Sequence, residues 1–266
     1  MTSSKDNRSI PDEGLFRPWL LRYWVGKYLA RVYAGGKITG GFFSGMSYIG
    51  ESVGSQLPPK YFGTYECELI PILEELSRIA FPTIIDVGAA EGFYAVGCAI
   101  KWPNSQVIAF ETSAHGRDSI GELARLNGVS SRITILGHCE VKALAEAVPC
   151  SGESLVIVDV EGAEYDLLQP SLIPALQGAD ILVEVHERVH PDLEATLKQR
   201  FAATHSATVI GTRPRTLADF VKPHSSLLRR LFQRSLIAAV DEWRGGPMQW
   251  LYFAPTTRRS RKSSLS

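Results

Sequence analysis

Acidic residues follow two apolar segments of the chain, at points where a strand would give way to a loop. The segment 83–87 (TIIDV) contains Asp86 and runs into the glycine-rich sequence GAAEG at 88–92, and the segment 106–110 (QVIAF) runs into Glu111. Glycines let a backbone turn sharply and approach a ligand closely. An acid at a strand end can accept both hydroxyls of a ribose, and acids beside it would attract an ammonium or sulfonium group. Together the two segments predict a site for a cationic ligand that contains a ribose.

The spacing of the glycines differs from that of a dinucleotide site. Such a site would carry GxGxxG, whose second glycine lets the pyrophosphate approach the start of a helix, and this spacing is absent after residue 87. Acids at Asp86 and Glu91 would also repel a diphosphate. Taken alone, the segment also fits an ordinary turn between a strand and a helix. Taken with Glu111, it predicts S-adenosylmethionine, which has a ribose and an amino acid portion and no phosphate.

A second set of acids, with one histidine, falls at the ends of the apolar segments LVIVD and DILVEV. Asp159 and Glu161 belong to the first, and Glu184 and His186 to the second. Two chemical interpretations stay open: His186 or a carboxylate removes the proton of an acceptor hydroxyl, or the carboxylates hold a divalent ion that acidifies it. A structural alternative is that Glu184 bonds to backbone and only shapes the pocket. We predict these four as the catalytic residues, and the divalent metal ion is an alternative that we do not predict.

Short apolar segments alternate with segments of helix length over most of the chain. This alternation predicts right-handed βαβ units and a parallel sheet covered on both faces. The expected strands are 83–87, 106–110, 132–136, 155–159 and 180–185, and the expected helices are 64–78, 92–101, 117–127, 141–148 and 191–202. Strand-like segments at 207–211 and 248–254, with a helix near 225–240 between them, would complete a mostly parallel seven-stranded sheet of the Rossmann-like α/β class.

The segment before these elements has a different composition. Residues 15–33 combine aromatic and leucine residues with four basic residues and no acid, which predicts an amphipathic helix, and the glycine-punctuated residues 37–56 predict a small hairpin. The end of the chain is basic and serine-rich, which is typical of disorder. We therefore expect a helix and hairpin extension over 1–60, one domain over 61–255 and a disordered basic tail over 256–266.

Four segments of the sequence resemble those of class I S-adenosylmethionine-dependent methyltransferases of the FkbM type. They are IIDVGAAEGFYAV (84–96), VIAFETS (107–113), LVIVDVEGAEYDLL (155–168) and ILVEVHE (181–187), and the third is the most specific. The likeness covers about residues 61–255. It implies methyltransferase activity with S-adenosylmethionine as cofactor. It also implies O-methylation of a hydroxyl on a sugar, a glycosylated metabolite or a polyketide-type metabolite.

The resemblance also implies roles for single residues. Residues 88–93 would line the methionine portion of the cofactor, Glu111 would hold the ribose, and residues 137–139 would lie beside the adenine. Related enzymes often have an acid near the adenine amino group, where this chain has His138. Glu66 would reach the ammonium group, although it fits equally well an acid that the helix macrodipole favours. The predicted cofactor-binding residues are Glu66, Asp86, Gly88, Ala89, Glu91, Gly92, Phe93, Glu111, Gly137, His138, Cys139 and Asp159.

Charge is distributed unevenly along the chain. The 28 basic and 28 acidic residues balance, but residues 1–40 hold seven basic and three acidic residues, and 221–266 hold nine and two. The acidic middle suits a sulfonium cofactor. For the basic helix at 15–33, two alternatives stay open: it lies in an anionic membrane interface, or it packs its aromatic face on the domain. We expect a small-molecule acceptor and no nucleic acid partner, because no nucleic-acid-binding module is recognisable.

The composition excludes several classes of protein. With 45% hydrophobic and 21% charged residues, the chain is typical of a globular protein. Four separated cysteines without a CxxC motif argue against a disulfide scaffold or a structural zinc site and favour a cytoplasmic location. No run of 18 apolar residues and no early apolar segment occurs, so we expect neither a membrane span nor a secretory signal.

Two rival functions stand beside the methyltransferase. A methyltransferase-like binding or scaffold protein would bind the cofactor without turning it over. A nucleotide-dependent oxidoreductase would need a dinucleotide site, and the missing GxGxxG spacing disfavours it.

Overall fold

The computed structural model describes residues 18–150, 153–220, 226–242 and 248–257. They form a seven-stranded sheet with the strand order β3-β2-β1-β4-β5-β7-β6. All pairs are parallel except those of β7, which runs antiparallel to β5 and β6. The strands are β1 (Thr83–Val87), β2 (Gln106–Phe110), β3 (Ile133–Leu136), β4 (Ser154–Val158), β5 (Asp180–Val185), β6 (His205–Gly211) and β7 (Gln249–Pro255). The predicted Rossmann-like α/β sheet is therefore confirmed.

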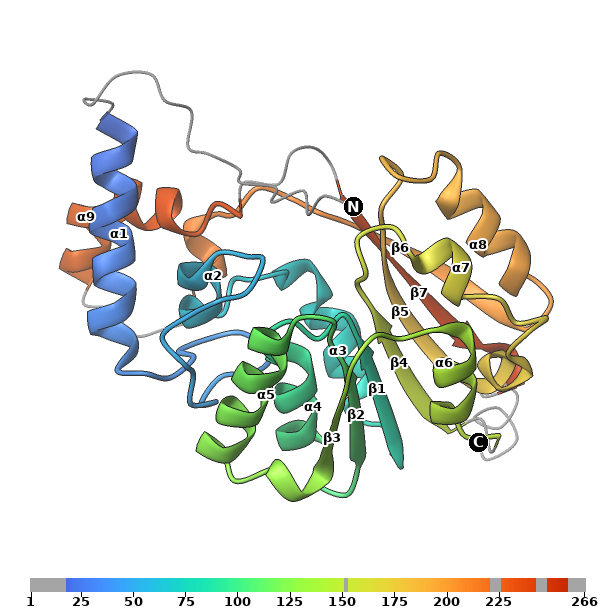
Figure 1. The fold of residues 1–266 in the computed structure, drawn as a ribbon. Coiled ribbons are helices and arrows are strands. Elements are labelled where there is room, and N and C mark those ends of the chain that lie inside the picture. The colour runs from blue at the N-terminus through green and yellow to red at the C-terminus, as the bar shows by residue number, and fades with distance from the viewer. Residues whose placement is uncertain (1–17, 151–152, 221–225, 243–247, 258–266) are drawn as a thin grey trace, which may run out of the picture.

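Helices cover both faces of the sheet, with α4 and α5 on one face and α6 and α8 on the other (Figure 1). The helices are α1 (Pro18–Ala34), α2 (Leu57–Phe62), α3 (Ile70–Leu76), α4 (Phe93–Lys101), α5 (Ala114–Leu126), α6 (Val141–Ala147), α7 (Glu164–Leu167), α8 (Leu193–Phe201) and α9 (Ser226–Ala239). Along β4, Ile157 faces one hydrophobic cluster and Val156 faces the other. Burial on both faces explains the almost uninterrupted apolar sequence of the central strands.

The hairpin predicted over 37–56 is present only in part, where the Ile38 N–H donates to the Met46 carbonyl and the Tyr48 N–H donates to the Gly36 carbonyl. Only a single antiparallel bridge, between Lys37 and Ser47, forms there. The intervening backbone turns back on itself, with Gly41 and Gly45 at positive φ, and places Phe43 in the core. The Phe43 ring lies so close to Gly97 of α4 that a Cβ at Gly97 would stand 2.6 Å from it. The turn between the bridged residues therefore packs against α4.

The helix expected over 64–78 begins later than predicted. A 3-10 turn at Cys67–Leu69 precedes α3, and Pro71 occupies the first turn of α3. Proline is favoured at that position because the first amides of a helix have no acceptor within the helix. Glu66 is the N-cap residue of this 3-10 turn and has a φ of 45°.

Helix α1 packs along α9, apart from the sheet (Figure 1). Gly26 makes this close crossing possible, since a Cβ there would lie 2.2 Å from the Ser235 carbonyl oxygen. Within α1, Tyr23 and Ala30 are buried, so part of the aromatic face packs on the protein as one alternative expected. Among the described residues, no helix combines the length and hydropathy needed to cross a bilayer. The domain boundaries stay a prediction, and the tail from 258 onward lies outside the described residues.

Candidate functional site

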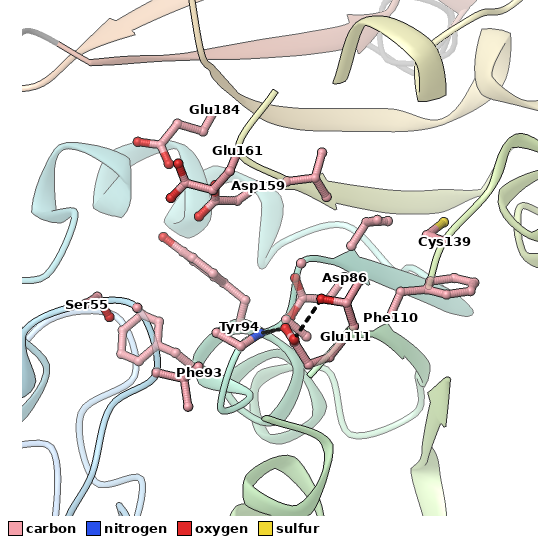
Figure 2. Close-up of a pocket in the computed structure, with 18 of the residues that line it drawn as sticks. Ser55, Asp86, Phe93, Tyr94, Phe110, Glu111, Cys139, Asp159, Glu161 and Glu184 are labelled. Atoms are coloured by element: carbon pink, nitrogen blue, oxygen red, sulfur yellow. Dashed lines mark hydrogen bonds between the residues drawn. The ribbon is translucent and has the colours of Figure 1, made fainter. Parts of the chain in front are cut away.

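A pocket of about 400 Å³ opens at the carboxyl ends of β1, β2, β4 and β5 (Figure 2). This volume lies within the usual range for small-molecule sites. The strand order reverses between β1 and β4, and open α/β sheets bind ligands at this switch point. The lining includes these predicted residues: Glu66, Asp86, Gly88, Ala89, Phe93, Glu111, Gly137, His138, Cys139, Asp159, Glu161 and Glu184.

The backbone around the pocket is strained at three residues that line it. Ala90, Glu161 and Glu66 have φ angles of 50°, 53° and 45°, in the left-handed region that side chains with a Cβ disfavour. Such strain persists where surrounding contacts hold it, and it is common at functional sites. Gly88 is required for a different reason. A Cβ there would stand 1.7 Å from the Asp159 carbonyl oxygen, because the loops after β1 and β4 touch at this point.

Glu111 holds one of these strained residues in place. Its Oε2 accepts a hydrogen bond from the Ala90 backbone N–H at 2.8 Å, and its Oε1 accepts one from the Ser113 N–H at 2.7 Å. Oε1 also accepts from the Thr112 hydroxyl at 3.5 Å. Each carboxylate oxygen has two lone pairs, so Oε2 keeps acceptor capacity for a ribose hydroxyl. The position at the pocket wall agrees with the predicted ribose contact.

Asp86 is fully enclosed beneath the glycine-rich loop. It is 3% exposed, and its Oδ2 has no hydrogen-bond partner among the described residues. Burial raises the pKa of Asp86 to about 7, and the nearby Glu111 carboxylate adds to the rise. A cationic ligand in the pocket would favour the ionised form. Asp86 is therefore suited to a sulfonium or ammonium group.

Glu66 enters the pocket from the loop before α3. Its carboxylate accepts a hydrogen bond from the Tyr94 hydroxyl, and its backbone N–H donates to Glu242 Oε1 at 3.1 Å. Glu242 is held in turn by Arg215, a buried guanidinium that also donates to Glu68. This network connects the 3-10 turn before α3, the segment after β6 and the segment after α9 around one end of the pocket.

The opposite end of the pocket is built from the loop after β3. Gly137, His138 and Cys139 line it with Phe110, which ends β2 (Figure 2). The His138 side chain is exposed at the rim. Burial raises the pKa of the Cys139 thiol to about 12, so Cys139 is not a nucleophile at neutral pH. This wall suits the adenine position that the sequence predicts.

Three predicted site residues lie outside the pocket lining. Glu91 is fully buried on the other side of its loop, where Lys60, Tyr48 and Ser52 donate to its carboxylate. Burial opposes ionisation of Glu91, but Lys60 and the other donors hold its pKa below the ordinary value. The prediction that Glu91 lines the methionine portion is therefore not supported, because its carboxylate is committed to this buried cluster.

Gly92 caps α4 with a φ of 95°, and a Cβ there would press on Ile120, so its role is in the turn rather than in the lining. His186 lies just behind the lining. Its Nδ1 is 2.6 Å from Glu164 Oε1, and its Nε2 faces Asp159, Glu161 and Glu184 at 3.6 to 3.8 Å. The structure thus brings the four predicted catalytic residues together. Glu164 also accepts from the Val160 and Gly162 N–H groups and shapes the loop after β4.

Sequence reasoning missed a segment that lines the pocket beside the glycine-rich loop. Residues 53–56, together with Lys60 and Tyr65, line the pocket from before the first strand. The Val53 N–H donates to Glu91 Oε2 at 2.9 Å, which ties this segment to the glycine-rich loop. Lys60 is buried there, with Nζ 4.7 Å from the centre of the Tyr65 ring, and no sequence motif marks this burial.

No protein-family model matches the chain. A release factor glutamine methyltransferase from Chlorobaculum tepidum is 31% identical over 130 residues, which are 48% of this chain and 40% of that protein. The chain therefore matches less than half the length of this curated relative.

Two solved structures are similar over most of the chain at low identity. A candidate O-methyltransferase from Klebsiella pneumoniae is 16% identical with a TM-score of 0.46, covering 93% of this chain and 92% of that one. The human methyltransferase 10 domain containing protein is 11% identical with a TM-score of 0.47, covering 88% and 96%. Both likenesses are distant, so the fold assignment rests on the strand order of this chain. The curated relative is named as a methyltransferase, and nothing in this match distinguishes the FkbM type.

Proposed function

We propose that the protein is an S-adenosylmethionine-dependent methyltransferase of the FkbM type that methylates a hydroxyl. The acceptor class is a sugar, a glycosylated metabolite or a polyketide-type metabolite. One observation carries the proposal, and it concerns the pocket at the switch point between β1 and β4. The pocket has carboxylates at its centre that suit a cationic ligand with a ribose, and it has a second cluster of carboxylates beside them. Figure 2 shows Glu111 and Asp86 at the centre and Asp159, Glu161 and Glu184 grouped at one end.

In this arrangement each end of the pocket takes one part of the cofactor. The wall at 137–139 receives the adenine, Glu111 receives the ribose, and Asp86 and Glu66 face the positive charges of the methionine portion. Opposite charges a few ångströms apart in a partly buried site attract strongly. The methyl group would then point toward the carboxylate group of Asp159, Glu161 and Glu184.

Methyl transfer to a hydroxyl requires alignment and removal of one proton. The acceptor oxygen attacks the methyl carbon in line with the carbon–sulfur bond. The new O–C bond would form as the C–S bond breaks. The electron pair of the C–S bond would pass to sulfur, which would neutralise the sulfonium and leave S-adenosylhomocysteine. The hydroxyl proton passes to a carboxylate of the group. Glu161 is the most accessible of these, with 75% of its side chain exposed.

The test combines cofactor binding with product formation. Calorimetry measures S-adenosylmethionine binding, and release of S-adenosylhomocysteine is followed with hydroxylated acceptors and their matched deoxy analogues. A glutamine amide is included because the curated relative is named as a glutamine methyltransferase. We expect turnover with a hydroxylated acceptor and at least tenfold less with Asp159→Asn. Glu187→Gln, which changes an exposed acid after β5, should leave turnover unchanged.

Each other outcome contradicts a stated part of the proposal. No cofactor binding to the wild type removes the methyltransferase assignment. Binding without S-adenosylhomocysteine formation from any acceptor favours the catalytically silent scaffold protein. Turnover with the amide and with no hydroxylated acceptor keeps the methyltransferase and contradicts O-methylation.

We also propose peripheral contact of α1 with an anionic membrane. Trp24, Tyr28 and Val32 stand one turn apart on α1 and are 54%, 68% and 62% exposed. Lys27 and Arg31 lie between them, and Lys27 Nζ is 5.2 Å from the centre of the Trp24 ring. Aromatic residues flanked by basic ones bind interfaces that carry anionic lipids. Buried Tyr23 and Ala30 anchor the other side of α1 to the protein.

A further inference from the structure

Three side chains at the end of the pocket next to β5 direct their ligand atoms toward one space. The carboxylates of Asp159 and Glu184 and the imidazole of His186 each offer an atom, and these atoms lie within 4.8 Å of one another. Asp159 follows β4, whereas Glu184 and His186 come from β5 and its end, so the pairing of these two strands sets their positions. We propose that these three residues bind a divalent metal ion.

The distances suit a shared ion better than direct contact. His186 Nε2 lies 3.7 Å from Asp159 Oδ1 and 3.8 Å from Glu184 Oε2, beyond the roughly 3.2 Å limit of an N–H···O hydrogen bond. Ligand atoms about 2.1 Å from a metal ion stand about 3.0 Å apart as octahedral neighbours, about 3.4 Å apart in a tetrahedron and about 4.2 Å apart across the ion. The observed separations fall inside this range.

The state of His186 is an independent observation that points to a ligand. Its side chain is 7% exposed, and Nε2 has no hydrogen-bond partner among the described residues. A buried polar atom without a partner costs folding free energy. The other ring nitrogen, Nδ1, is paired with Glu164 Oε1 at 2.6 Å. A carboxylate on the second nitrogen is the usual partner of a metal-bound histidine, because it fixes the tautomer that leaves the first nitrogen free to bind the ion.

A cation in this space would also satisfy the carboxylates of Asp159 and Glu184. Asp159 Oδ1 is buried without a hydrogen-bond partner among the described residues. Asp159 and Glu184 offer carboxylate oxygens within 4.8 Å of each other, and two ionised carboxylates that close in a partly buried site need a proton or a cation between them. Glu161 Oε2, 3.6 Å from His186 Nε2, stands on the open side of the group as a further ligand.

The ligand set selects the class of ion. One imidazole with two or three carboxylates suits a divalent first-row ion such as Mn²⁺ better than Ca²⁺, which prefers oxygen ligands alone. Bound there, the ion would hold and acidify an acceptor oxygen. That catalytic role rests on the proposed function, whereas binding of the ion can be tested without it.

The experiment measures binding of Mn²⁺ to the full chain after treatment with a chelator, by calorimetry and by loss of the free-ion electron paramagnetic resonance signal. We expect one ion per chain and at least tenfold weaker binding in Asp159→Asn, Glu184→Gln and His186→Gln. The positioning variant Glu164→Gln should weaken binding about 10- to 100-fold. Glu187→Gln, an exposed acid next to His186 in the sequence, should bind Mn²⁺ as the wild type does.

Thermal melting and circular dichroism establish that each variant is folded. If a variant does not fold, a measurement on the wild type takes its place. Co²⁺ bound through an imidazole should show visible absorption bands, and added Mn²⁺ should suppress these bands by competition. The proposal is overturned if the wild type takes up neither Mn²⁺ nor Co²⁺ at about 1 mM, or if the three ligand variants bind as the wild type does. Mn²⁺ binding without methyl transfer counts against the proposed function and not against this site. Methyl transfer without ion binding counts against this site and not against the proposed function.

Discussion

Glu111 at the end of β2 accepts a hydrogen bond from the backbone N–H of Ala90, 2.8 Å away in the loop after β1. Ala90 has a φ of 50°, which an alanine does not adopt without support from its surroundings. The same carboxylate lines the cofactor pocket. Glu111 therefore supports the loop after β1, and in the proposed function it also accepts the ribose hydroxyls.

Replacing Glu111 separates these roles. Glu111→Ala removes both and should weaken S-adenosylmethionine binding at least tenfold, about 1.4 kcal/mol. Glu111→Gln keeps an oxygen for the Ala90 N–H and should lose less affinity than Glu111→Ala. Calorimetry measures both, with Glu122→Ala on the exposed face of α5 as the control. Equal affinity of Glu111→Ala and wild type would contradict the assignment of Glu111 to the cofactor.

Asp86 should make the protein less stable as pH rises through neutrality. Its pKa of about 7 lies above the ordinary value of 3.8, so between these pH values the folded state holds a proton that the unfolded state has lost. The free energy of unfolding therefore falls with pH across this window. Asp86→Asn should remove this slope and be more stable than wild type at pH 8, by on the order of 1 kcal/mol or more. Denaturant titrations at pH 5 and pH 8 measure the difference.

The same group should make cofactor affinity depend on pH with the opposite sign. The ionised Asp86 attracts the cofactor's positive charge, so affinity should rise as pH passes about 7. Asp86→Asn should bind more weakly and lose this rise. A variant that is both less stable at pH 8 and unchanged in affinity would show that Asp86 is a packing residue only.

The sheet could be predicted from sequence because its signal is local. Strands β1, β2 and β5 have the predicted bounds, since apolar runs buried on both faces can be recognised without knowing their neighbours. The acids at strand ends could be placed for the same reason: parallel strands bring their carboxyl ends to one edge. Asp86, Glu111 and Asp159 therefore line the pocket as expected.

The parts that could not be predicted depend on partners far away in the sequence. Glu91 belongs to the same motif as Gly88, but its partner Lys60 lies 31 residues away and turns the carboxylate out of the pocket. The position of Phe43, inside the predicted hairpin, depends in the same way on Gly97 of α4. Neither contact leaves a periodic pattern in the sequence. Motif spacing therefore assigns Glu91 to the cofactor, whereas in the structure the Glu91 carboxylate contacts Ser52, Val53 and Lys60.

Membrane contact of α1 can be tested by vesicle sedimentation. The double variant Trp24→Ala/Tyr28→Ala should bind anionic vesicles at least fivefold more weakly than wild type, because it removes the exposed aromatic area that inserts into the interface. Leu126→Ala/Leu172→Ala removes exposed apolar side chains elsewhere and should bind as wild type does. Binding by neither wild type nor control, or equal loss in both double variants, would sink the proposed contact.

The buried pair of Lys60 and Glu91 should respond asymmetrically to loss of each partner. Glu91→Ala leaves the Lys60 ammonium, 2% exposed, without its counter-ion, and should cost about 3–5 kcal/mol of unfolding free energy. Lys60→Met should cost less, because Glu91 keeps the Tyr48 hydroxyl at 2.5 Å and the Val53 N–H at 2.9 Å. Both variants should weaken cofactor binding, since residues 53–56 line the pocket. Denaturant unfolding measures the unfolding free energy of each variant. A greater loss of this free energy in Lys60→Met than in Glu91→Ala would show that the neutral donors do not hold the carboxylate.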